Sequence, residues 1–241
     1  MLLSNLVYPQ EIFFGSTEPV KPASSKNGIV SLHNVLSPQR QVLENFIQGR
    51  YADCYHADVS HFLPLLLAAQ AGDSVSGVLG LSPGNRGRFF VENYVEESIE
   101  QLITTRTGSF TARARIIETG NLAASRGGSQ LLFILLTELL YRSGYRWIIF
   151  TATIQVNALL QRLGFAPEVV CEASPEKLVN KGKDWGSYYE NNPYVLTGDV
   201  EQAHSTLERN PFAQKVLQDH AEVIQLLTAQ LQAEGDIVAD E

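Results

Sequence analysis

The sequence is poor in the residues that build metal sites, disulfides and membrane spans. Of its 241 residues only two are cysteines, Cys54 and Cys171, and neither these nor the five histidines follow a metal-ligand or disulfide spacing. Residues 1–5 lack the basic start of a signal peptide, and no run of about 18 apolar residues occurs anywhere. We therefore expect no metal, no transmembrane segment, and a cytoplasmic protein with reduced thiols.

Positive charge is also scarce, and it is unevenly placed. The net charge of −8 argues against nucleic acid as the main partner. Residues 101–165, however, hold seven arginines and only two acidic residues. An arginine-rich stretch on an acidic protein suits an anionic ligand, such as a phosphopantetheine arm or an acidic carrier protein. The alternative is that these arginines pair with acidic residues elsewhere in the chain.

Hydrophobic periodicity and turn residues predict an alternation of helices and strands. Gly164 suits the left-handed residue that ends a helix. The expected elements are an irregular segment at 1–36, a helix at 38–57, a hairpin of strands at 62–70 and 74–81, a short strand or extended run at 88–91, a helix at 95–105, a strand at 111–119, a buried helix at 129–142, a strand at 147–150 followed by a helix that ends at 164, and an amphipathic helix at 212–233.

This order predicts an α/β fold with a mixed, twisted sheet whose central strands splay apart between flanking helices. It is the order of the GCN5-related N-acetyltransferase (GNAT) fold, in which a strand, a short polar break, a helix and Gly-Phe form half of the acyl-donor site. We expect three parts: residues 1–36, an acyltransferase domain at 37–199, and a C-terminal helix with an acidic tail at 200–241. The C-terminal helix packs either on the core or on a second subunit, which would make a homodimer.

Four short strings then point to a family. They are Glu-Thr-Gly-Asn-Leu-Ala-Ala at 118–124, Trp-Gly-Ser-Tyr-Tyr at 185–189, Phe-Val-Glu-Asn-Tyr at 90–94 and Arg-Leu-Gly-Phe at 162–165. Together they resemble the thermostable hemolysin family over residues 40–200. That family is similar to acyl-homoserine-lactone synthases and long-chain N-acyl amino acid synthases, which are GNAT-like. Those enzymes carry a glutamate on the same strand, ahead of an Arg-Phe-Ala-like string, where this chain has Asn121-Leu122.

Two departures from ordinary acetyltransferases concern the acyl donor. The usual Gln/Arg-x-x-Gly-x-Gly/Ala loop is replaced by Ser-Arg-Gly-Gly-Ser at 125–129, which offers amides and an arginine for one phosphate. Leu160 stands where many acetyltransferases place a tyrosine. Both differences favour an acyl carrier protein over CoA as the donor, with the acyl-phosphopantetheine thioester as a substrate and no permanently bound cofactor.

The resemblance implies a site at the end of the 111–119 strand. Glu118 is the candidate general base and Glu92 the second choice, while Asn121 could orient a substrate or serve only the backbone. A structural alternative for Glu118 is a pair with Arg113 or Arg115, or a cap for the following loop. Residues expected at the donor are Leu122, Ala123, Arg126, Gly127, Gly128, Thr151 and Asn157. Residues expected at a substrate are Arg113, Arg115, Trp185 and Tyr188, although core packing would also explain the two aromatic ones.

The sequence thus predicts an N-acyltransferase that moves a fatty acyl group from a carrier-bound thioester to a small amine such as an amino acid. The alternative is a non-catalytic membrane-active or interaction protein on the same scaffold, because a fold does not fix a function. Gly72-Asp73-Ser74 mimics the start of a lipase motif, but it lies in a predicted hairpin and no Asp-x-x-His follows it.

Overall fold

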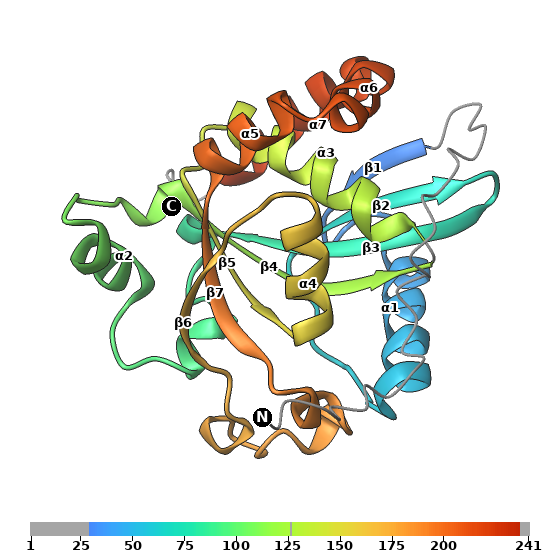
Figure 1. Ribbon diagram of the computed structural model, residues 1–241. Coiled ribbons are helices and arrows are strands. Elements are labelled where there is room, and N and C mark those ends of the chain that lie inside the picture. The colour runs from blue at the N-terminus through green and yellow to red at the C-terminus, as the bar shows by residue number, and fades with distance from the viewer. Residues whose placement is uncertain (1–28, 126, 237–241) are drawn as a thin grey trace, which may run out of the picture.

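The computed structural model describes residues 29–125 and 127–236, and a seven-stranded sheet forms its centre (Figure 1). The sheet order is β1-β2-β3-β4-β5-β7-β6. All neighbours run antiparallel except β4 and β5, which are parallel. The strands are β1 (Ile29–His33), β2 (Leu65–Ala71), β3 (Ser74–Pro83), β4 (Ile116–Ala124), β5 (Trp147–Ala152), β6 (Glu168–Glu172) and β7 (Tyr194–Asp199).

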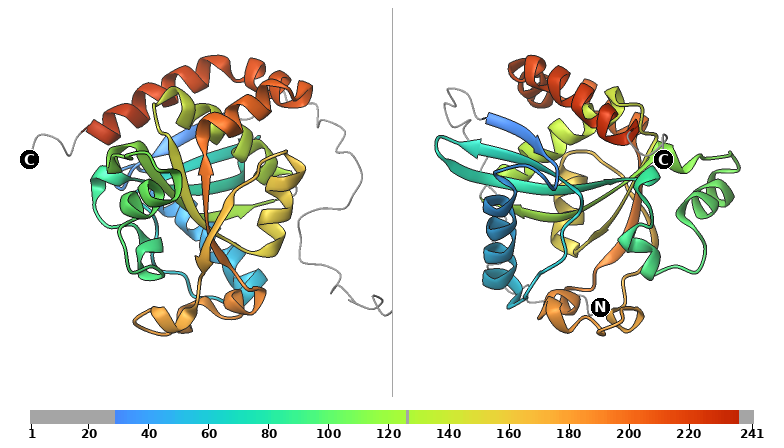
Figure 2. Two further views of the ribbon diagram at one scale, coloured as in Figure 1. Left: turned by 60° about the vertical axis from the view of Figure 1, so that its left-hand side comes forward. Right: turned by 180° about the vertical axis from the view of Figure 1, so that it is seen from behind.

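Helices cover both faces of this sheet (Figure 2). They are α1 (Arg40–Tyr55), α2 (Ile99–Thr107), α3 (Gly128–Arg142), α4 (Ile154–Arg162), α5 (Val200–Glu208), α6 (Pro211–Asp219) and α7 (Ala221–Asp236). Alternate β2 residues face opposite ways, so that Leu66 packs in the core formed with α1 and Leu67 in the core formed with α3 and α5–α7. A third core lies around α2 and the 3₁₀ turn η2 (Phe90–Asn93).

The two parallel strands part midway along the sheet. β4 pairs with β5 from Ile116 opposite Trp147 to Thr119 opposite Phe150, and no pair follows, although β4 continues to Ala124. On the other side, β4 stays paired with β3 as far as Ala124. Backbone groups of β4 beyond Thr119 that face β5 are therefore left open, which confirms the expected splayed, GNAT-like sheet.

Most expected elements are present, and the differences have local causes. Residues 88–91 do not form a strand, because they lead into η2, whose amides bind side chains instead of a neighbouring strand. Residues 113–115 form a 3₁₀ turn, so β4 begins at Ile116. Because β4 then runs on to Ala124, Glu118 lies inside the strand and not at its end.

The two ends of the expected domain also differ from the sequence interpretation. Residues 29–33 form β1 along the edge of the sheet, while residues 1–28 lie outside the described residues. The single helix expected at 212–233 is two helices, because the chain leaves helical geometry at His220. The acidic tail expected at the C-terminus falls largely in 237–241, which is also outside the described residues.

The C-terminal helices pack on the sheet's own helices. Ile224, Leu227 and Leu231 of α7 belong to the core that contains α3. Glu234 accepts a hydrogen bond from Asn34 at 2.7 Å and forms an ion pair with Arg86. The described part of α7 thus has a place on this subunit, and a homodimer through it stays a prediction.

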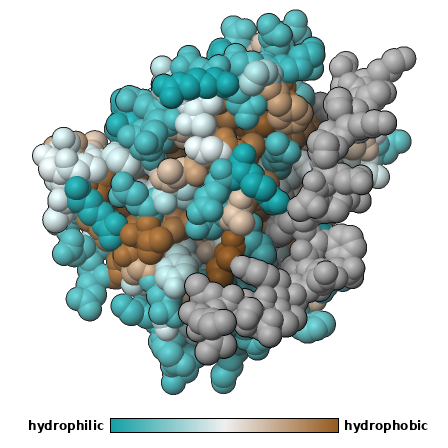
Figure 3. Space-filling view, viewed as in Figure 1, coloured by the Kyte–Doolittle hydropathy of each residue, from teal (hydrophilic) through white to brown (hydrophobic). Residues whose placement is uncertain are grey.

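Hydrophilic residues cover most of the face in Figure 3, and hydrophobic residues surface in patches between the elements. One patch lies over β6, where Val169 is exposed. Among the helices of the described ranges, none combines the length and apolar character needed to cross a membrane.

Candidate functional site

A pocket opens where β4 and β5 separate, and we refer to it as the β4–β5 pocket. Its volume is about 90 Å³. It collects residues from α1, β4, β5, the start of α4 and the loops around them. The lining residues are Tyr51, Tyr55, His61, Leu63, Phe90, Glu118, Thr119, Gly120, Asn121, Leu122, Thr151, Thr153, Val156, Trp185 and Tyr188.

Glu118 is the acidic residue in this lining. Its side chain projects from β4 and is only 3% exposed. Oε2 accepts a hydrogen bond from the backbone N–H of Phe90 at 2.7 Å, and Oε1 accepts one from Val91 at 2.9 Å. Since a carboxylate offers about four lone-pair positions, these two bonds leave acceptor capacity toward the pocket.

Two opposing effects set the protonation of Glu118. Burial raises its pKa to about 7, while the two backbone hydrogen bonds favour the ionised form and hold the rise back. The nearby charge of Glu92 adds to the increase. Glu118 makes no ion pair with Arg113 or Arg115 among the described residues, because Arg113 binds other carboxylates. A carboxyl group that titrates near neutral pH in a cleft has the properties of a general base.

Glu92 lies beside the pocket and not in its lining. It is 8% exposed and pairs with Arg113 at 2.7 Å, and it accepts the N–H of Phe89 at 2.9 Å. Burial alone would raise the pKa of Glu92, but the hydrogen bonds and charge of Arg113 and the backbone bonds bring it below the ordinary value. Glu92 is thus ionised, and its oxygens already accept hydrogen bonds from the protein. By accepting the N–H of Phe89 it fixes the start of the η2 turn, whose amides at Phe90 and Val91 bind Glu118.

Neither of the two arginines expected at a substrate lines the β4–β5 pocket. Arg113 donates to the carbonyl oxygens of Gly84 and Gly87, pairs with Glu92 and Glu100, and stacks over the Phe89 ring at 4.3 Å. Arg115 is exposed, and it precedes β4 at the end of the strand away from the splay. The structure therefore gives Arg113 a role in supporting the site from outside.

Asn121 has a backbone role at the pocket. Its φ of 50° is in the left-handed region, at an irregularity of the β3–β4 pairing. The side-chain Oδ1 accepts from Leu63 N at 2.9 Å, and Nδ2 donates to the carbonyl oxygen of His61 at 3.1 Å. Gly80 makes room for this amide, because a Cβ there would lie 2.8 Å from Oδ1. Asn121 thus holds the 61–63 segment across the pocket.

The residues expected at the donor lie in different parts of the structure. Leu122 and Thr151 line the pocket from the two separated strands, whereas Ala123 pairs with Val78 of β3 and lies in the core. The Asn157 side chain on α4 has a buried Oδ1 with no hydrogen-bond partner among the described residues. Arg126 lies outside the described residues.

The start of α3 is built from glycines, as the sequence indicates. Gly127 is the N-cap residue with a φ of 83°, and Gly128 packs so closely on β3 that a Cβ would lie 2.4 Å from the carbonyl oxygen of Ser76. Ser129 follows, and its buried Oγ has no partner among the described residues. The amide of Gly128 donates to the carbonyl oxygen of Ser125 at 3.0 Å. The positive end of the helix dipole and the hydroxyl of Ser129 nevertheless suit an anionic group.

An aromatic cluster closes the pocket on the α1 side. The rings of Trp185 and Tyr188 lie 5.3 Å apart, and Tyr188 meets Tyr55 edge-on at 5.3 Å. Gly186 has a φ of 51°, and a Cβ there would lie 2.0 Å from the carbonyl oxygen of Tyr55. The glycine of the Trp-Gly-x-Tyr-Tyr string therefore lets this loop press on the end of α1. Trp185 and Tyr188 serve both the core and the pocket wall.

Sequence reasoning missed several lining residues, because they come from elements far from the strings. Tyr51 and Tyr55 read only as apolar positions of an amphipathic helix, and His61 only as one of five histidines. Thr153 precedes α4 and is 2% exposed, and its Oγ1 has no hydrogen bond of good geometry among the described residues. Burial raises the pKa of Tyr55, and the nearby Thr153 hydroxyl opposes that rise.

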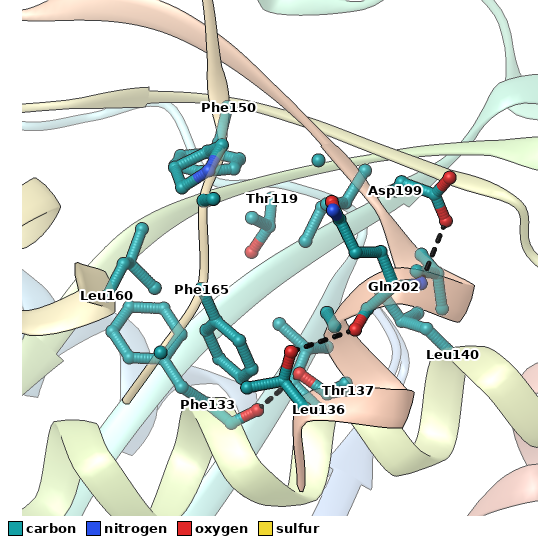
Figure 4. A pocket seen from close by; sticks show the side chains of 18 residues that line it. Thr119, Phe133, Leu136, Thr137, Leu140, Phe150, Leu160, Phe165, Asp199 and Gln202 are labelled. Carbon is teal, nitrogen blue, oxygen red and sulfur yellow. Dashed lines mark hydrogen bonds between the residues drawn. The ribbon is translucent and has the colours of Figure 1, made fainter. Parts of the chain in front are cut away.

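A second, apolar cavity lies on the other face of the sheet, and we call it the α3–α5 pocket (Figure 4). Its volume is about 110 Å³. Phe133 and Leu136 of α3, Leu160 of α4 and Phe165 contribute to its wall (Figure 4). Thr119, the last β4 residue paired with β5, lines both this cavity and the β4–β5 pocket. Thr119 therefore lies between the two cavities, at the point where the strands part.

A mixed sheet with parting parallel strands, beside a glycine-initiated helix, defines the GNAT-like class of α/β fold. The chain belongs to the thermostable hemolysin family, whose sequence profile matches residues 33–204. Among curated proteins, none matches the chain.

Solved structures of low identity share the fold. The structure of TofI in an apo form aligns with a TM-score of 0.51 and 13% identity, over 77% of this chain and 99% of that one. The acyl-homoserine-lactone synthase LasI aligns with a TM-score of 0.50 and 11% identity, over 73% and 91%. The CoA-dependent acyl-homoserine-lactone synthase BjaI, with SAM and isopentyl-CoA, gives 0.50 and 15%, over 76% and 89%.

The raised pKa of Glu118 predicts a pH-dependent stability that Glu118→Gln lacks. Between the ordinary value of 4.5 and about 7, Glu118 is ionised in the unfolded chain but protonated in the folded one. Its contribution to the free energy of unfolding is therefore present at low pH and lost as pH rises through about 7. From pH 5 to 8.5 the wild type should lose about 2–3 kcal/mol relative to the variant. Urea unfolding across this range measures the difference, and a constant difference would contradict the raised pKa.

Proposed function

We propose that the protein is an N-acyltransferase that moves an acyl group from a thioester to an amine at the β4–β5 pocket. The observation that carries the proposal is Glu118, a buried carboxyl with a pKa of about 7 at the point where β4 and β5 part. Burying a carboxyl group lowers the stability of the folded protein, so a protein that made no use of the group would gain by losing it. This favours an enzyme over a non-catalytic scaffold.

The proposed reaction needs one base and one polar groove. The amine nitrogen attacks the thioester carbonyl carbon, a C–N bond forms and the C–S bond breaks. One amine proton passes to Glu118 and then to the departing sulfur, which leaves as a thiol. In the described part of the chain, the β5-facing backbone of residues 120–122 has no partner strand, so its amides are available for the carbonyl oxygen or the pantetheine arm.

The acyl chain would lie in the α3–α5 pocket. This cavity is lined mainly by apolar side chains and shares Thr119 with the β4–β5 pocket. A chain attached to a carbonyl beside Glu118 would pass Thr119 between the parted strands and enter the apolar space. Burial of each methylene there stabilises the complex by about 0.8 kcal/mol, which favours fatty acyl over acetyl groups.

The donor would be an acyl carrier protein in preference to CoA. The short glycine segment before α3 provides for one phosphate, and the N-cap and buried hydroxyl at Gly127 and Ser129 are consistent with that. The unpartnered Asn157 Oδ1 on α4 is an acceptor for an amide N–H of the pantetheine arm. The reaction would take place in the cytoplasm, where acyl carriers are found.

Glu118→Gln tests the catalytic step. Loss of the general base should lower kcat/KM by about 10²–10⁴-fold. In the wild type kcat/KM should rise with pH up to about 7, as Glu118 ionises, and the variant should lose this rise. The deficit should shrink above about pH 9, where more of the acceptor is already free amine.

A control is needed because both Glu118 oxygens accept backbone N–H groups, so the glutamine NH₂ would face one donor and destabilise the variant. Glu138→Gln is matched: Glu138 is 5% exposed, pairs with Arg142 and His204, and lines none of the pockets described here. Both variants are assayed below their melting temperatures. Equal activity of the two would remove Glu118 from the mechanism.

Ala203→Phe tests the acyl pocket. Ala203 of α5 lines the α3–α5 pocket, and a phenyl ring there should fill much of it. The preferred acyl chain should become shorter by several carbons, because a close-packed wall does not yield to a long chain without strain. Mass spectrometry of products from a mixed-chain donor pool measures the profile. Glu208→Phe, on an exposed part of the same helix, is the control and should leave the profile unchanged. An unchanged profile in Ala203→Phe would place the chain elsewhere.

The carrier is tested by comparing donors with the same acyl chain. The acyl carrier protein should give a higher kcat/KM than the acyl-CoA. Between about 50 and 500 mM salt, kcat/KM should fall steeply for the carrier-bound donor only, because salt screens the charge pairing with the carrier. Arg126→Glu should raise KM for the carrier, whereas Arg209→Glu, an exposed control between α5 and α6, should not. Equal use of both donors at every salt concentration would reject the carrier.

A further inference from the structure

A third cavity adjoins the β4–β5 pocket on its solvent side, and we call it the Asp58–Asp184 pocket. Its volume is about 340 Å³. His61, Phe90 and Trp185 line both cavities, so the third one lies next to the space beside Glu118. Its lining residues are Asp58, Val59, Ser60, His61, Phe90, Asn93, Leu178, Val179, Asn180, Asp184 and Trp185.

The charge of this lining is negative. Asp58 N donates to the carbonyl oxygen of Asp184 at 2.7 Å, which holds the two acidic residues next to each other. The Asp184 carboxylate accepts a hydrogen bond from Asn180, and the Asp58 side chain has no ion-pair partner among the described residues. Within the ranges that the structure describes, no lysine or arginine lines the cavity. Lys181 lies in the same loop but pairs with Glu176 at 3.4 Å.

Aromatic side chains form the wall that this cavity shares with the β4–β5 pocket. The His61 and Phe90 rings stack with centroids 6.0 Å apart, and Phe90 lies 5.9 Å from Trp185. Ring faces attract cations, with Trp the strongest of the aromatic side chains. A cation bound between the two carboxylates would therefore lie beside aromatic side chains that also line the pocket of Glu118.

We propose that the Asp58–Asp184 pocket binds the acceptor, and that the acceptor is a primary amine with a second positive charge and no carboxylate, as in an aliphatic diamine. This rests on the proposed acyl transfer at Glu118. The reacting amine loses its proton before attack, so only a second ammonium group keeps a charge for the two carboxylates. The carboxylate of an amino acid would face Asp58 and Asp184 with no lining cation. The acceptor is then a cationic amine and not an amino acid, which was one example of the small amine expected from the sequence.

The test uses three primary amines of four carbons each, with the full chain and its better acyl donor. They are 1,4-diaminobutane, butylamine and 4-aminobutanoate, whose distal ends are an ammonium group, a methyl group and a carboxylate. In the wild type kcat/KM should decrease in that order, and the advantage of the diamine should shrink with added salt.

Neutral variants then locate the effect. Asp58→Asn and Asp184→Asn should each raise KM for 1,4-diaminobutane by up to about fivefold with kcat unchanged, which is the range of an exposed charge pair. KM for butylamine should change little, and use of 4-aminobutanoate should improve. Asp73→Asn is the matched control, because Asp73 is an exposed acid in the β2–β3 turn and lines none of these cavities.

The outcomes separate this inference from the proposed function. If amines are acylated but 4-aminobutanoate serves as well as the diamine, or the two variants behave like Asp73→Asn, the inference is wrong and acyl transfer stands. If no amine is acylated, acyl transfer is wrong, and calorimetry of 1,4-diaminobutane binding decides the inference alone. Binding that is lost when Asp58→Asn and Asp184→Asn are combined supports the inference, and absence of binding to the wild type overturns it.

Discussion

The candidate site depends on one interaction, the pair of hydrogen bonds from consecutive backbone amides to the Glu118 carboxylate. Those bonds compensate part of the cost of burying a carboxylate and set its orientation. Their donors, Phe90 and Val91, lie in a short 3₁₀ turn, which is itself too small to be rigid without support. Glu92 and Arg113 give that support by tying the turn to α2 and to the loops after β3. Two ion pairs outside the pocket thus determine the geometry inside it.

The fold could be predicted from the sequence because its signals are local. The buried strand at 147–150, its polar break and the following helix carry their own periodicity, and Gly164 takes the left-handed conformation its position suggested. The errors fall where tertiary contacts override local pattern. The extended run at 88–91 became a turn because its amides bind Glu118, and the helix break at His220 has no proline or glycine to announce it.

The candidate site was predictable only in part, for a related reason. Glu118, Asn121, Thr151 and Trp185 lie within or beside recognisable strings and do line one pocket. The arginines were assigned from charge alone, and charge does not reveal whether a guanidinium is already occupied, as that of Arg113 is. His61 and the α1 tyrosines reach the pocket through long-range packing, which leaves no pattern in a single sequence.

The position of Thr119 has a consequence for the product. It lines two cavities on opposite faces of the sheet, so the product of the proposed acyl transfer would have its head on one face and its tail on the other. Such a molecule would lie between the two strands, and the hydrogen bonds between β4 and β5 would block its exit on one side. As the product leaves, its tail would return to water, at a cost that grows with each carbon. In this arrangement the products with the longest chains would dissociate most slowly. For them kcat would be limited by product release and not by the chemical step.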